Sequence, residues 1–332
     1  MIKTVIIGAG GIAERHAESI NRLPNVEVAG VIDVKIENAR KIAHICNSKV
    51  VSKLEDILDE VQIVHLLTPP SKRLEYAEKA MKAGKHVLCE KPIAVNMQDA
   101  QKISELAKEN GVLFMTGFNM RFRPGYLKLQ HDVLSGKLGD IVGIWSHRIG
   151  PGSGFKTNLG DSWRTDPKLV CGMTIESLSH DIDMFRGLGI EITSVSAKVK
   201  GIRPEIPFFD NNAQVVMGLS NGASAVINAS WSSHLPMSTR GVIGTKGTAV
   251  IEGRGFFDFM EYRIRTEEME CEQISLINDP FNSNSYYEEN KYFVECIENG
   301  RRRFITEDNG IEALKVSLAI LESSREQRLI QL

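Results

Sequence analysis

The sequence contains few cysteines and no long apolar run. Its five cysteines are far apart and form no Cys-x-x-Cys pair, so neither a disulfide framework nor a zinc ribbon is expected. No stretch approaches the roughly 20 apolar residues that cross a bilayer. The first apolar run, residues 5–7, is too short for a signal peptide. We therefore expect a cytoplasmic protein without a membrane partner.

The chain also lacks an excess of basic charge. Its 40 Lys and Arg residues are balanced by 42 Asp and Glu residues, so no nucleic-acid partner is expected. It has neither an internal repeat nor a low-complexity segment. At roughly 150 residues per domain, a length of 332 residues predicts two domains that each bury a core.

Residues 1–120 alternate short apolar runs with helical segments. The expected strands are residues 2–7, 26–32, 61–67, 86–89 and 112–116. Strands separated by helices of this length predict βαβ units and a parallel sheet that is buried on both faces. Such a sheet binds ligands at the carboxyl ends of its strands.

After residue 120 the strand signals follow one another more closely. They fall at residues 141–149, 192–200, 213–219, 223–230, 241–244, 248–252 and 261–265, with helices at 174–187, at 285–299 and from 309. Asn221-Gly222 joins two of these runs and is typical of a hairpin turn. Residues 121–332 are therefore expected to form an α+β domain with a large, mostly antiparallel sheet. The polar, glycine-rich loop 150–162 has a length typical of functional loops.

The segment Gly8-Ala9-Gly10-Gly11-Ile12-Ala13 follows the first strand and begins a helix. In this G-x-G-x-x-A pattern the first glycine allows a tight turn, the second lets the backbone approach a pyrophosphate, and the small last residue lets helix and strand pack closely. Asp33 ends the second strand and is placed for ribose hydroxyls. Its charge repels a 2′-phosphate, although Lys35 weakens that repulsion. The pattern predicts a Rossmann domain that binds NAD, with NADP as an alternative. A glycine turn in another kind of α/β protein is the competing interpretation.

Two further turns end strands at the same edge of the predicted sheet. Thr68-Pro69 follows one strand, and Glu90-Lys91-Pro92 follows the next. The Lys91 ammonium can polarise a hydroxyl or carbonyl oxygen, and Glu90 can orient it. The competing interpretation is an exposed ion pair of little energetic value.

Glu176, His180 and Asp183 have the i, i+4, i+7 spacing that places side chains on one helix face. A carboxylate one turn from an imidazole can set its tautomer and raise its basicity, which produces a general base. A purely structural histidine is the alternative. A zinc site would need further ligands, so no metal is expected.

Two aromatic pairs are weaker candidates. Trp163-Arg164 follows the glycine-rich loop, where the arginine can bind a phosphate or a carboxylate. Tyr286-Tyr287 begins a late helix and can donate hydrogen bonds to a polar ligand. Packing explains either pair equally well. Among the histidines, His16 lies nearest the glycine motif.

Six ordered segments, GAGGIAERH, TPPS, AGKHVLCEKP, GFNMRFRP, WRTDP and GMTIESLSHDID, resemble the glucose–fructose oxidoreductase / inositol dehydrogenase / MocA (Gfo/Idh/MocA) family. The resemblance extends over nearly the whole chain. It implies an N-terminal Rossmann domain for NAD or NADP and a C-terminal domain that holds the substrate. It also implies a homodimer or homotetramer formed through the open C-terminal sheet. The implied reaction is hydride transfer at a secondary alcohol of a sugar, polyol or inositol.

The resemblance also implies roles for individual residues. His180 is the expected proton acceptor, Lys91 the stabiliser of the alkoxide, and Glu176 the acid that assists the histidine. The cofactor is expected at Gly8, Gly10, Gly11, Ile12, Ala13, Asp33, Thr68, Pro69, Glu90, Lys91, Trp163 and Arg164, and the substrate at Lys91, Asn119, Arg121, Glu176, His180 and Tyr286.

Three positions depart from the family pattern. Glu176 replaces the usual Asp, Cys171-Gly172 replaces a glycine pair, and Arg73 stands where a histidine is common. We therefore expect an NAD-dependent oxidoreductase, and the substrate of a family member is not assigned to it. The alternatives are an NADP-dependent ketosugar reductase and a dinucleotide-binding sensor without turnover.

Overall fold

The computed structural model describes residues 1–152, 163–166, 169, 171–202, 206, 209–254, 259–277, 284–300 and 308–332. Contacts divide the chain into two compact units. The first contains Met1–Asn119 and Asn284–Leu314, and the second contains Met120–Ser283 and Lys315–Leu332. The sequence predicted a single boundary near residue 120, whereas the chain returns to the first unit at residue 284. Helix α9 (Ser285–Asn299) accounts for this return, because its Phe293 and Val294 are buried in one cluster with Leu88 and Met115.

The described strands of the first unit form a six-stranded parallel sheet in the order β3-β2-β1-β4-β5-β6. The strands are β1 (Ile2–Ile7), β2 (Val26–Ile32), β3 (Lys49–Val50), β4 (Ile63–Leu66), β5 (His86–Glu90) and β6 (Phe114–Gly117). The chain builds the sheet outward from β1 to one side with β2 and β3, and then to the other side with β4, β5 and β6. The point beside β1 where the order of the strands reverses is the topological switch point at which such sheets bind ligands. The predicted parallel sheet is therefore confirmed.

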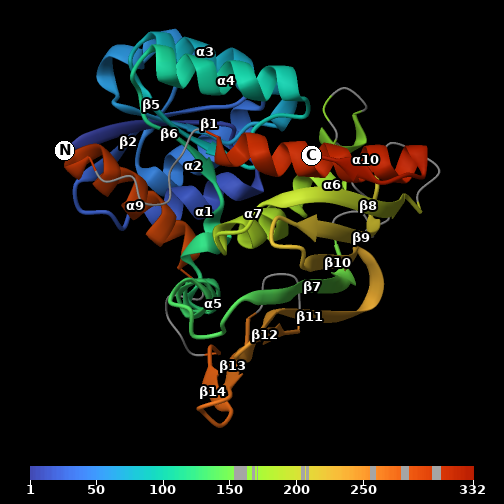
Figure 1. The fold of residues 1–332 in the computed structure, drawn as a ribbon. Helices are drawn as coiled ribbons and strands as arrows, with labels where there is room; N and C mark the ends of the chain where they lie inside the picture. The colour runs from blue at the N-terminus through green and yellow to red at the C-terminus, as the bar shows by residue number, and fades with distance from the viewer. Residues whose placement is uncertain are drawn as a thin grey trace. The chain divides into compact units, whose positions relative to one another are not determined.

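Helices cover both faces of this sheet. They are α1 (Gly11–Ile20), α2 (Ile36–Cys46), α3 (Arg73–Lys82) and α4 (Met97–Glu109), together with α9. Figure 1 shows α3 and α4 on one face and α1, α2 and α9 on the other. Three short 3₁₀ segments, Leu54–Asp56, Leu58–Glu60 and Pro70–Lys72, lie in the connections.

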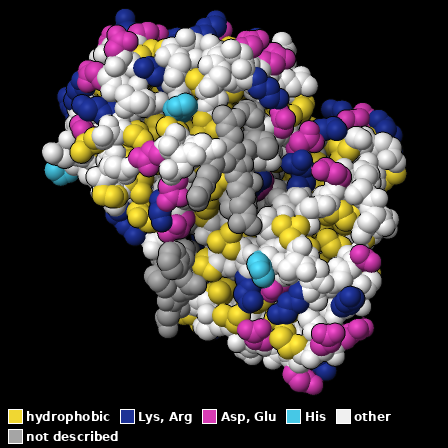
Figure 2. Space-filling model, turned by 60° about the vertical axis from the view of Figure 1, so that its left-hand side comes forward, with side chains coloured by type: hydrophobic (Ala, Val, Ile, Leu, Met, Phe, Trp, Pro, Cys, Tyr) yellow, Lys and Arg dark blue, Asp and Glu magenta, His cyan; other side chains and the backbone are white. Residues whose placement is uncertain are grey.

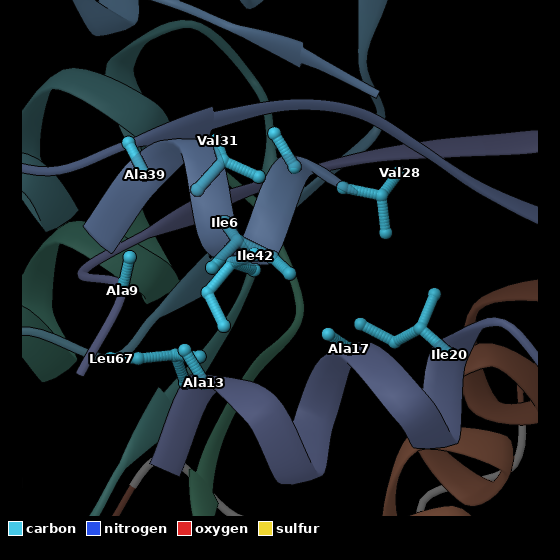
Figure 3. Packing of buried hydrophobic residues seen from close by; sticks show 11 residues of the cluster. Ile6, Ala9, Ala13, Ala17, Ile20, Val28, Val31, Ala39, Ile42 and Leu67 are labelled. Carbon is cyan, nitrogen blue, oxygen red and sulfur yellow. The ribbon is translucent and has the colours of Figure 1, made fainter. Parts of the chain in front are cut away.

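Small side chains bring α1 close to the sheet. Ala13 and Ala17 lie in the same buried cluster as Ile6, Val28 and Val31, as Figure 3 shows. An alanine occupies little space between a helix and a strand, so α1 packs closely on β1 and β2. This packing fixes the start of α1 at the ligand-binding edge of the sheet.

In the part of the chain that is described, the second unit contains a nine-stranded sheet. Its order is β14-β13-β12-β11-β7-β10-β9-β8-β15, and every pairing is antiparallel except that of β7 with β10. The strands are β7 (Ile141–Pro151), β8 (Ile192–Lys200), β9 (Asn212–Leu219), β10 (Ser224–Ser230), β11 (Ser232–Gly244), β12 (Gly247–Gly253), β13 (Glu261–Thr266), β14 (Glu272–Ser275) and β15 (Ile330–Gln331). The mostly antiparallel sheet and the hairpin at Asn221-Gly222 are confirmed, while β11 begins nine residues earlier than predicted, at Ser232 rather than residue 241.

The helices of the second unit differ from the prediction in one place. They are α5 (Pro124–Leu134), α6 (Met173–Glu176) and α7 (Ser179–Gly187), with 3₁₀ segments at Asn119–Phe122 and Trp163–Thr165. The residues of α10 (Asn309–Glu326) are divided between the first unit, up to Leu314, and the second unit, from Lys315. The predicted helix 174–187 is interrupted at Ser177. Its carbonyl oxygen accepts the His180 N–H at 3.3 Å, where a regular α-helix would pair it with Asp181, and it also accepts a hydrogen bond from the buried Arg148 guanidinium at 3.1 Å.

The described helices are too short or too polar to span a membrane. On the face that Figure 2 shows, basic side chains (dark blue) and acidic side chains (magenta) are interspersed. The balanced composition is thus reflected in the distribution of charge over that face.

Candidate functional site

The turn between β1 and α1 is shaped by glycine. Gly8 has φ +94°, and a Cβ atom there would lie 2.7 Å from the carbonyl carbon of Leu67. A side chain at Gly8 is therefore excluded both by conformation and by the neighbouring strand end. At Gly10 and Gly11, in contrast, a Cβ would meet no described atom within 4 Å. The turn thus leaves open space beside Gly10 and Gly11, at the start of α1, where helix N–H groups can bind a phosphate.

Asp33 lies at the end of β2 and holds this turn. Its Oδ2 accepts a hydrogen bond from the Ala9 N–H at 2.6 Å, and its Oδ1 accepts one from the Lys35 N–H at 2.8 Å. The carboxylate therefore lies beside the glycine turn, half-buried, where ribose hydroxyls of a dinucleotide would be bound. Gly8, Gly10, Gly11, Ile12, Ala13 and Asp33 are brought together as the sequence predicted, and their contact with a cofactor stays a prediction.

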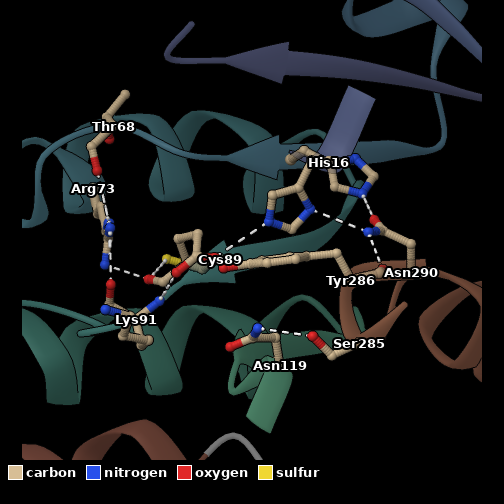
Figure 4. A network of polar contacts seen from close by, with 11 residues as sticks. His16, Thr68, Arg73, Cys89, Lys91, Asn119, Ser285, Tyr286 and Asn290 are labelled. Carbon is tan, nitrogen blue, oxygen red and sulfur yellow. Dashed lines mark hydrogen bonds and ion pairs between the residues drawn. The ribbon is translucent and has the colours of Figure 1, made fainter. Parts of the chain in front are cut away.

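A buried arginine joins the two strand ends that carry Thr68 and Lys91. Arg73, which is 3% exposed, donates to the Thr68 carbonyl oxygen at 3.1 and 3.0 Å and also to the carbonyl oxygen of Glu90. A longer bond of 3.4 Å reaches the Lys91 carbonyl oxygen. These bonds tie the end of β4 to the end of β5 (Figure 4). The sequence marked Arg73 only as a departure from the family pattern, since nothing local indicates which carbonyl groups a guanidinium will reach.

Glu90 binds the backbone of the residue that follows it. Its Oε2 accepts a hydrogen bond from the Lys91 N–H at 3.0 Å, and its Oε1 lies 3.3 Å from Nε2 of His16. Burial by itself would raise the pKa of Glu90. The hydrogen bond from His16 and the positive charges of Lys91 and Arg73 outweigh burial and hold the pKa below its usual value. Glu90 is therefore a buried carboxylate, not the exposed ion-pair partner that was the alternative.

His16 continues into a chain of buried polar groups, which Figure 4 shows. Its Nδ1 lies 3.1 Å from Nδ2 of Asn290, whose Oδ1 lies 2.7 Å from Nε2 of His65. Nδ1 of His65 in turn lies 2.7 Å from the Thr4 hydroxyl. Burial lowers the pKa of His65 to about 3, so this imidazole is neutral. No partner of His16 or His65 could be predicted, because Asn290 lies more than 200 residues away from either histidine along the chain.

Asn119 and Tyr286 also lie in the first unit. Asn119 is buried and donates to the Ser285 hydroxyl at 3.1 Å. The Tyr286 ring contacts the His16 ring edge to face, with their centres 5.2 Å apart. Both expected substrate residues are thus tied to the helix α9 that completes this unit. Their contact with a substrate stays a prediction.

The second unit brings the remaining candidates together on and around α6 and α7. Glu176, His180 and Asp183 are all buried, with exposures of 8%, 3% and 2%. Arg164 donates from Nε to both carboxylate oxygens of Glu176, at 3.1 and 2.9 Å, and from Nη2 to Oε1. Its guanidinium also lies 4.5 Å from the centre of the Trp163 ring. The sequence did not predict that Arg164 binds Glu176.

Asp183 has a similar partner. Arg121 donates to it from Nε at 2.6 Å and from Nη2. Each acidic neighbour of His180 in the predicted triplet is therefore held by an arginine. Most of the loop in which a functional segment was expected, residues 153–162, lies outside the described residues. The roles of Lys91, Glu176 and His180 in one reaction stay a prediction.

Both halves of the chain match models of one protein family. Residues 2–118 match the model described as an oxidoreductase family with an NAD-binding Rossmann fold, the Gfo/Idh/MocA family. Residues 126–250 match the model of the Gfo/Idh/MocA C-terminal domain.

Similar proteins and structures extend over the whole chain. An uncharacterized oxidoreductase of Bacillus subtilis strain 168 is 28% identical over 97% of this chain and 94% of its own length. The scyllo-inositol 2-dehydrogenase (NAD(+)) of the same organism is 25% identical over 100% of this chain and 96% of its own. The structure of levoglucosan dehydrogenase in complex with NADH and L-sorbose superposes with a TM-score of 0.88 at 20% identity, covering 100% of this chain and 98% of that one.

Proposed function

Because this chain belongs to the Gfo/Idh/MocA family of oxidoreductases with an NAD-binding Rossmann fold, we propose that it transfers a hydride between NAD and a secondary alcohol of a sugar, polyol or inositol. The observation that carries this proposal is the placement of Lys91. Its backbone is held at the carboxyl end of β5 by two buried side chains, Glu90 and Arg73. A lysine whose backbone is held at the ligand-binding edge of a dinucleotide-binding sheet is suited to polarise an alcohol oxygen with its ammonium group.

The first unit supplies the groups that would hold the dinucleotide. The open space at Gly10 and the N-terminus of α1 would receive the pyrophosphate, and Asp33 would bind a ribose. NAD supplies the acceptor for the hydride when it is bound. The negative charge of Asp33 opposes a 2′-phosphate, which supports NAD over NADP. Thr68, Pro69, Trp163 and Arg164 belong to the same proposal as further cofactor contacts.

Lys91 and His180 divide the chemistry at the alcohol between them in this proposal. His180 takes the hydroxyl proton as a general base, and Lys91 stabilises the negative charge that develops on the oxygen. Arg164 holds the Glu176 carboxylate on α6, and Arg121 holds the Asp183 carboxylate on α7, the helix that also carries His180. Asn119, Arg121 and Tyr286 are proposed to contact the remaining hydroxyl groups of the substrate.

The proposal is tested by turnover and cofactor binding in parallel. Pure protein is incubated with NAD and a panel of sugars and inositols, and absorbance is followed at the NADH band. His180→Ala and Lys91→Ala should each lower kcat at least about tenfold while the Kd for NADH changes little. Near-normal turnover in both variants would refute the mechanism. Cofactor binding without turnover on any substrate would favour the sensor alternative.

We also propose that the protein is a homodimer or homotetramer joined through the outer face of its nine-stranded sheet. Val216, Val226 and Ile243 are 52%, 40% and 45% exposed, and Val216 lies directly opposite Val226 on the neighbouring strand. Exposed apolar side chains grouped on one sheet face are typical of protein interfaces. Light scattering of the wild type and of Val216→Glu tests this. The variant should dissociate toward a monomer, and an unchanged mass would contradict the proposed interface.

A cytoplasmic location is the last part of the proposal. No disulfide joins the five cysteines, all of which lie within the described ranges, as suits a reducing compartment. Fractionation of the source cells with a tagged protein tests it.

A further inference from the structure

We propose that His16 and Asn290 are positioning residues for Lys91, which act on it through the Glu90 carboxylate. Neither side chain is bonded directly to Lys91 in this chain of contacts. Both are fully buried, with exposures of 0% and 1%. Asn290 lies on α9, which enters the first unit from the far end of the sequence. The inference rests on the proposed function only where it concerns turnover.

One backbone carbonyl group determines where the protons lie in this series of hydrogen bonds. Nδ2 of Asn290 lies 2.7 Å from the Tyr286 carbonyl oxygen, which can only accept, so the nitrogen of this amide is assigned without ambiguity. The second hydrogen of Nδ2 then points to Nδ1 of His16, 3.1 Å away. Nδ1 must accept it and carries no proton. His16 is therefore held as the tautomer with its proton on Nε2, the atom that faces Glu90.

The other end of the same amide agrees with this assignment. Its Oδ1 lies 2.7 Å from Nε2 of His65, which must donate. Because His65 is neutral, its Nδ1 then accepts the proton of the Thr4 hydroxyl at 2.7 Å. That contact is shorter than the 3.1 Å from the same hydroxyl to the Ile63 carbonyl oxygen. Every donor in the chain thus faces an acceptor.

The series of hydrogen bonds ends at the backbone N–H of Lys91. His16 donates to Oε1 of Glu90, and Oε2 of Glu90 accepts the Lys91 N–H at 3.0 Å. Loss of the His16 donor would leave Oε1 buried with one partner fewer and would free the carboxylate to turn about its last bond. The Lys91 N–H would then lose a fixed acceptor. Gly117 supports the same arrangement, since a Cβ there would lie 3.3 Å from the Glu90 Cα.

A metal ion is the competing interpretation of this cluster. Ligand atoms of His16, Glu90 and Glu289 lie within 4.8 Å of one another, all three buried. The proton assignment speaks against it, because one His16 nitrogen carries a proton toward Glu90 and the other accepts from Asn290. Neither nitrogen of His16 therefore has a lone pair left for a metal ion.

The experiment reads the Lys91 amide directly. Protein labelled with ¹⁵N-lysine is prepared, and the Lys91 resonance is identified by its loss in Lys91→Arg. In His16→Leu the Lys91 amide should exchange with solvent about tenfold faster than in the wild type, since its hydrogen bond is weakened. His16→Gln, whose amide nitrogen can reach the place of Nε2, should restore slow exchange. Ser323→Ala removes a buried hydroxyl that bonds the Ala197 N–H at 3.0 Å in the second unit, and it should leave exchange unchanged.

A double-variant cycle tests whether Asn290 acts on Lys91 through His16. Asn290→Ala should also speed the exchange, but it should add nothing in a His16→Leu background, because Asn290 acts only through His16. In kinetics, His16→Leu should lower kcat about tenfold with little change in KM or in the Kd for NADH. His16→Gln should recover most of the loss. A purely structural role would lower the Tm without this pattern.

The outcomes separate this inference from the proposed function. Unchanged Lys91 exchange in both His16→Leu and Asn290→Ala overturns the positioning role, whatever the activity. Additive effects in the cycle overturn the order Asn290, His16, Glu90. Faster exchange together with full turnover in Lys91→Ala supports the positioning role and removes the mechanism instead. Stoichiometric binding of Zn²⁺ or Mn²⁺ that is lost in His16→Leu would replace the inference by a metal site.

Discussion

Arg164 holds Glu176 through two nitrogen atoms of its guanidinium. Nε lies 2.9 Å from Oε2 and 3.1 Å from Oε1, and Nη2 donates to Oε1 as well. The pair joins the short segment at Trp163 to the end of α6. The extra methylene that distinguishes Glu176 from the family's aspartate thus extends toward an arginine that fixes it, and the substitution is structurally accommodated.

Breaking this pair should destabilise the protein. In Arg164→Leu the Glu176 carboxylate, which is 8% exposed, loses a charged donor, and we expect the free energy of unfolding to fall by about 1–3 kcal/mol. Urea unfolding at pH 7 measures it. Lys41→Met is the control, because it breaks an exposed pair with Glu14 that water screens, and it should destabilise the protein clearly less than Arg164→Leu does. Equal losses in the two variants would contradict a structural role for the Arg164 pair.

Two matched substitutions in the glycine turn should affect different properties, the first the stability of the fold and the second the binding of the cofactor. Gly8→Ala would place a Cβ 2.7 Å from the Leu67 carbonyl carbon at φ +94°, and it should destabilise the fold by about 1–3 kcal/mol. Gly10→Ala meets no described atom within 4 Å, so the Tm should change little. Its methyl group fills the space proposed for the pyrophosphate and should weaken NADH binding. Calorimetry and fluorescence titration check the pair. A Gly10→Ala protein that binds NADH normally would place the cofactor elsewhere.

Asp33 should control the choice between the two dinucleotides. Asp33→Asn keeps an oxygen acceptor for the Ala9 N–H but removes the negative charge. The ratio of the Kd for NADPH to that for NADH should therefore fall at least about tenfold. Lys35→Gln should shift the ratio in the opposite direction. If the wild type binds NADPH more tightly than NADH, the role given to Asp33 is wrong.

His65 should make the folded state sensitive to acid. Its pKa is lowered to about 3 by burial, whereas in the unfolded chain it titrates near its usual value of about 6.5. Below that value the unfolded state binds a proton that the folded state does not, so stability falls with decreasing pH by up to about 1.4 kcal/mol per pH unit. The full stability is present above about pH 6.5.

Replacing His65 by glutamine should remove this one-proton dependence. Urea unfolding of His65→Gln between pH 7 and pH 5 should show a shallower decline than that of the wild type. His44→Gln, at an exposed position in the last turn of α2, should retain the wild-type slope. Identical slopes in the wild type and His65→Gln would mean that His65 is protonated in the folded protein.

The residue pattern allowed most of the fold to be predicted, because the sheet elements have strong local signals. β-branched runs that end at glycine or aspartate gave β1 and β2, and Asn221-Gly222 gave the hairpin of β9 and β10. The interruption between α6 and α7 could not be predicted. It coincides with a hydrogen bond to the Ser177 carbonyl oxygen from Arg148, a residue of a strand that lies earlier in the chain.

The same limit applies to the candidate site. Gly8, Asp33 and Glu90 were found because each lies next to a strand end, where the local pattern places it. Arg73, Asn290 and the Arg164–Glu176 pair were not, since their partners are set by the tertiary fold. Asn290, for example, meets His16 across 274 residues of sequence. Such partners leave no periodic or spacing signal in a single sequence.

The return of the chain to its first unit at residue 284 has a consequence for biosynthesis. A nascent chain that has just left the ribosome as far as residue 119 carries all six parallel strands, yet the helix that covers Leu88 and Met115 has not been translated. Residues 1–119 therefore keep that apolar surface uncovered until the intervening sheet has been synthesised. A fragment cut after residue 119 should for the same reason be prone to aggregate, whereas a fusion that restores residues 284–314 should keep it in solution.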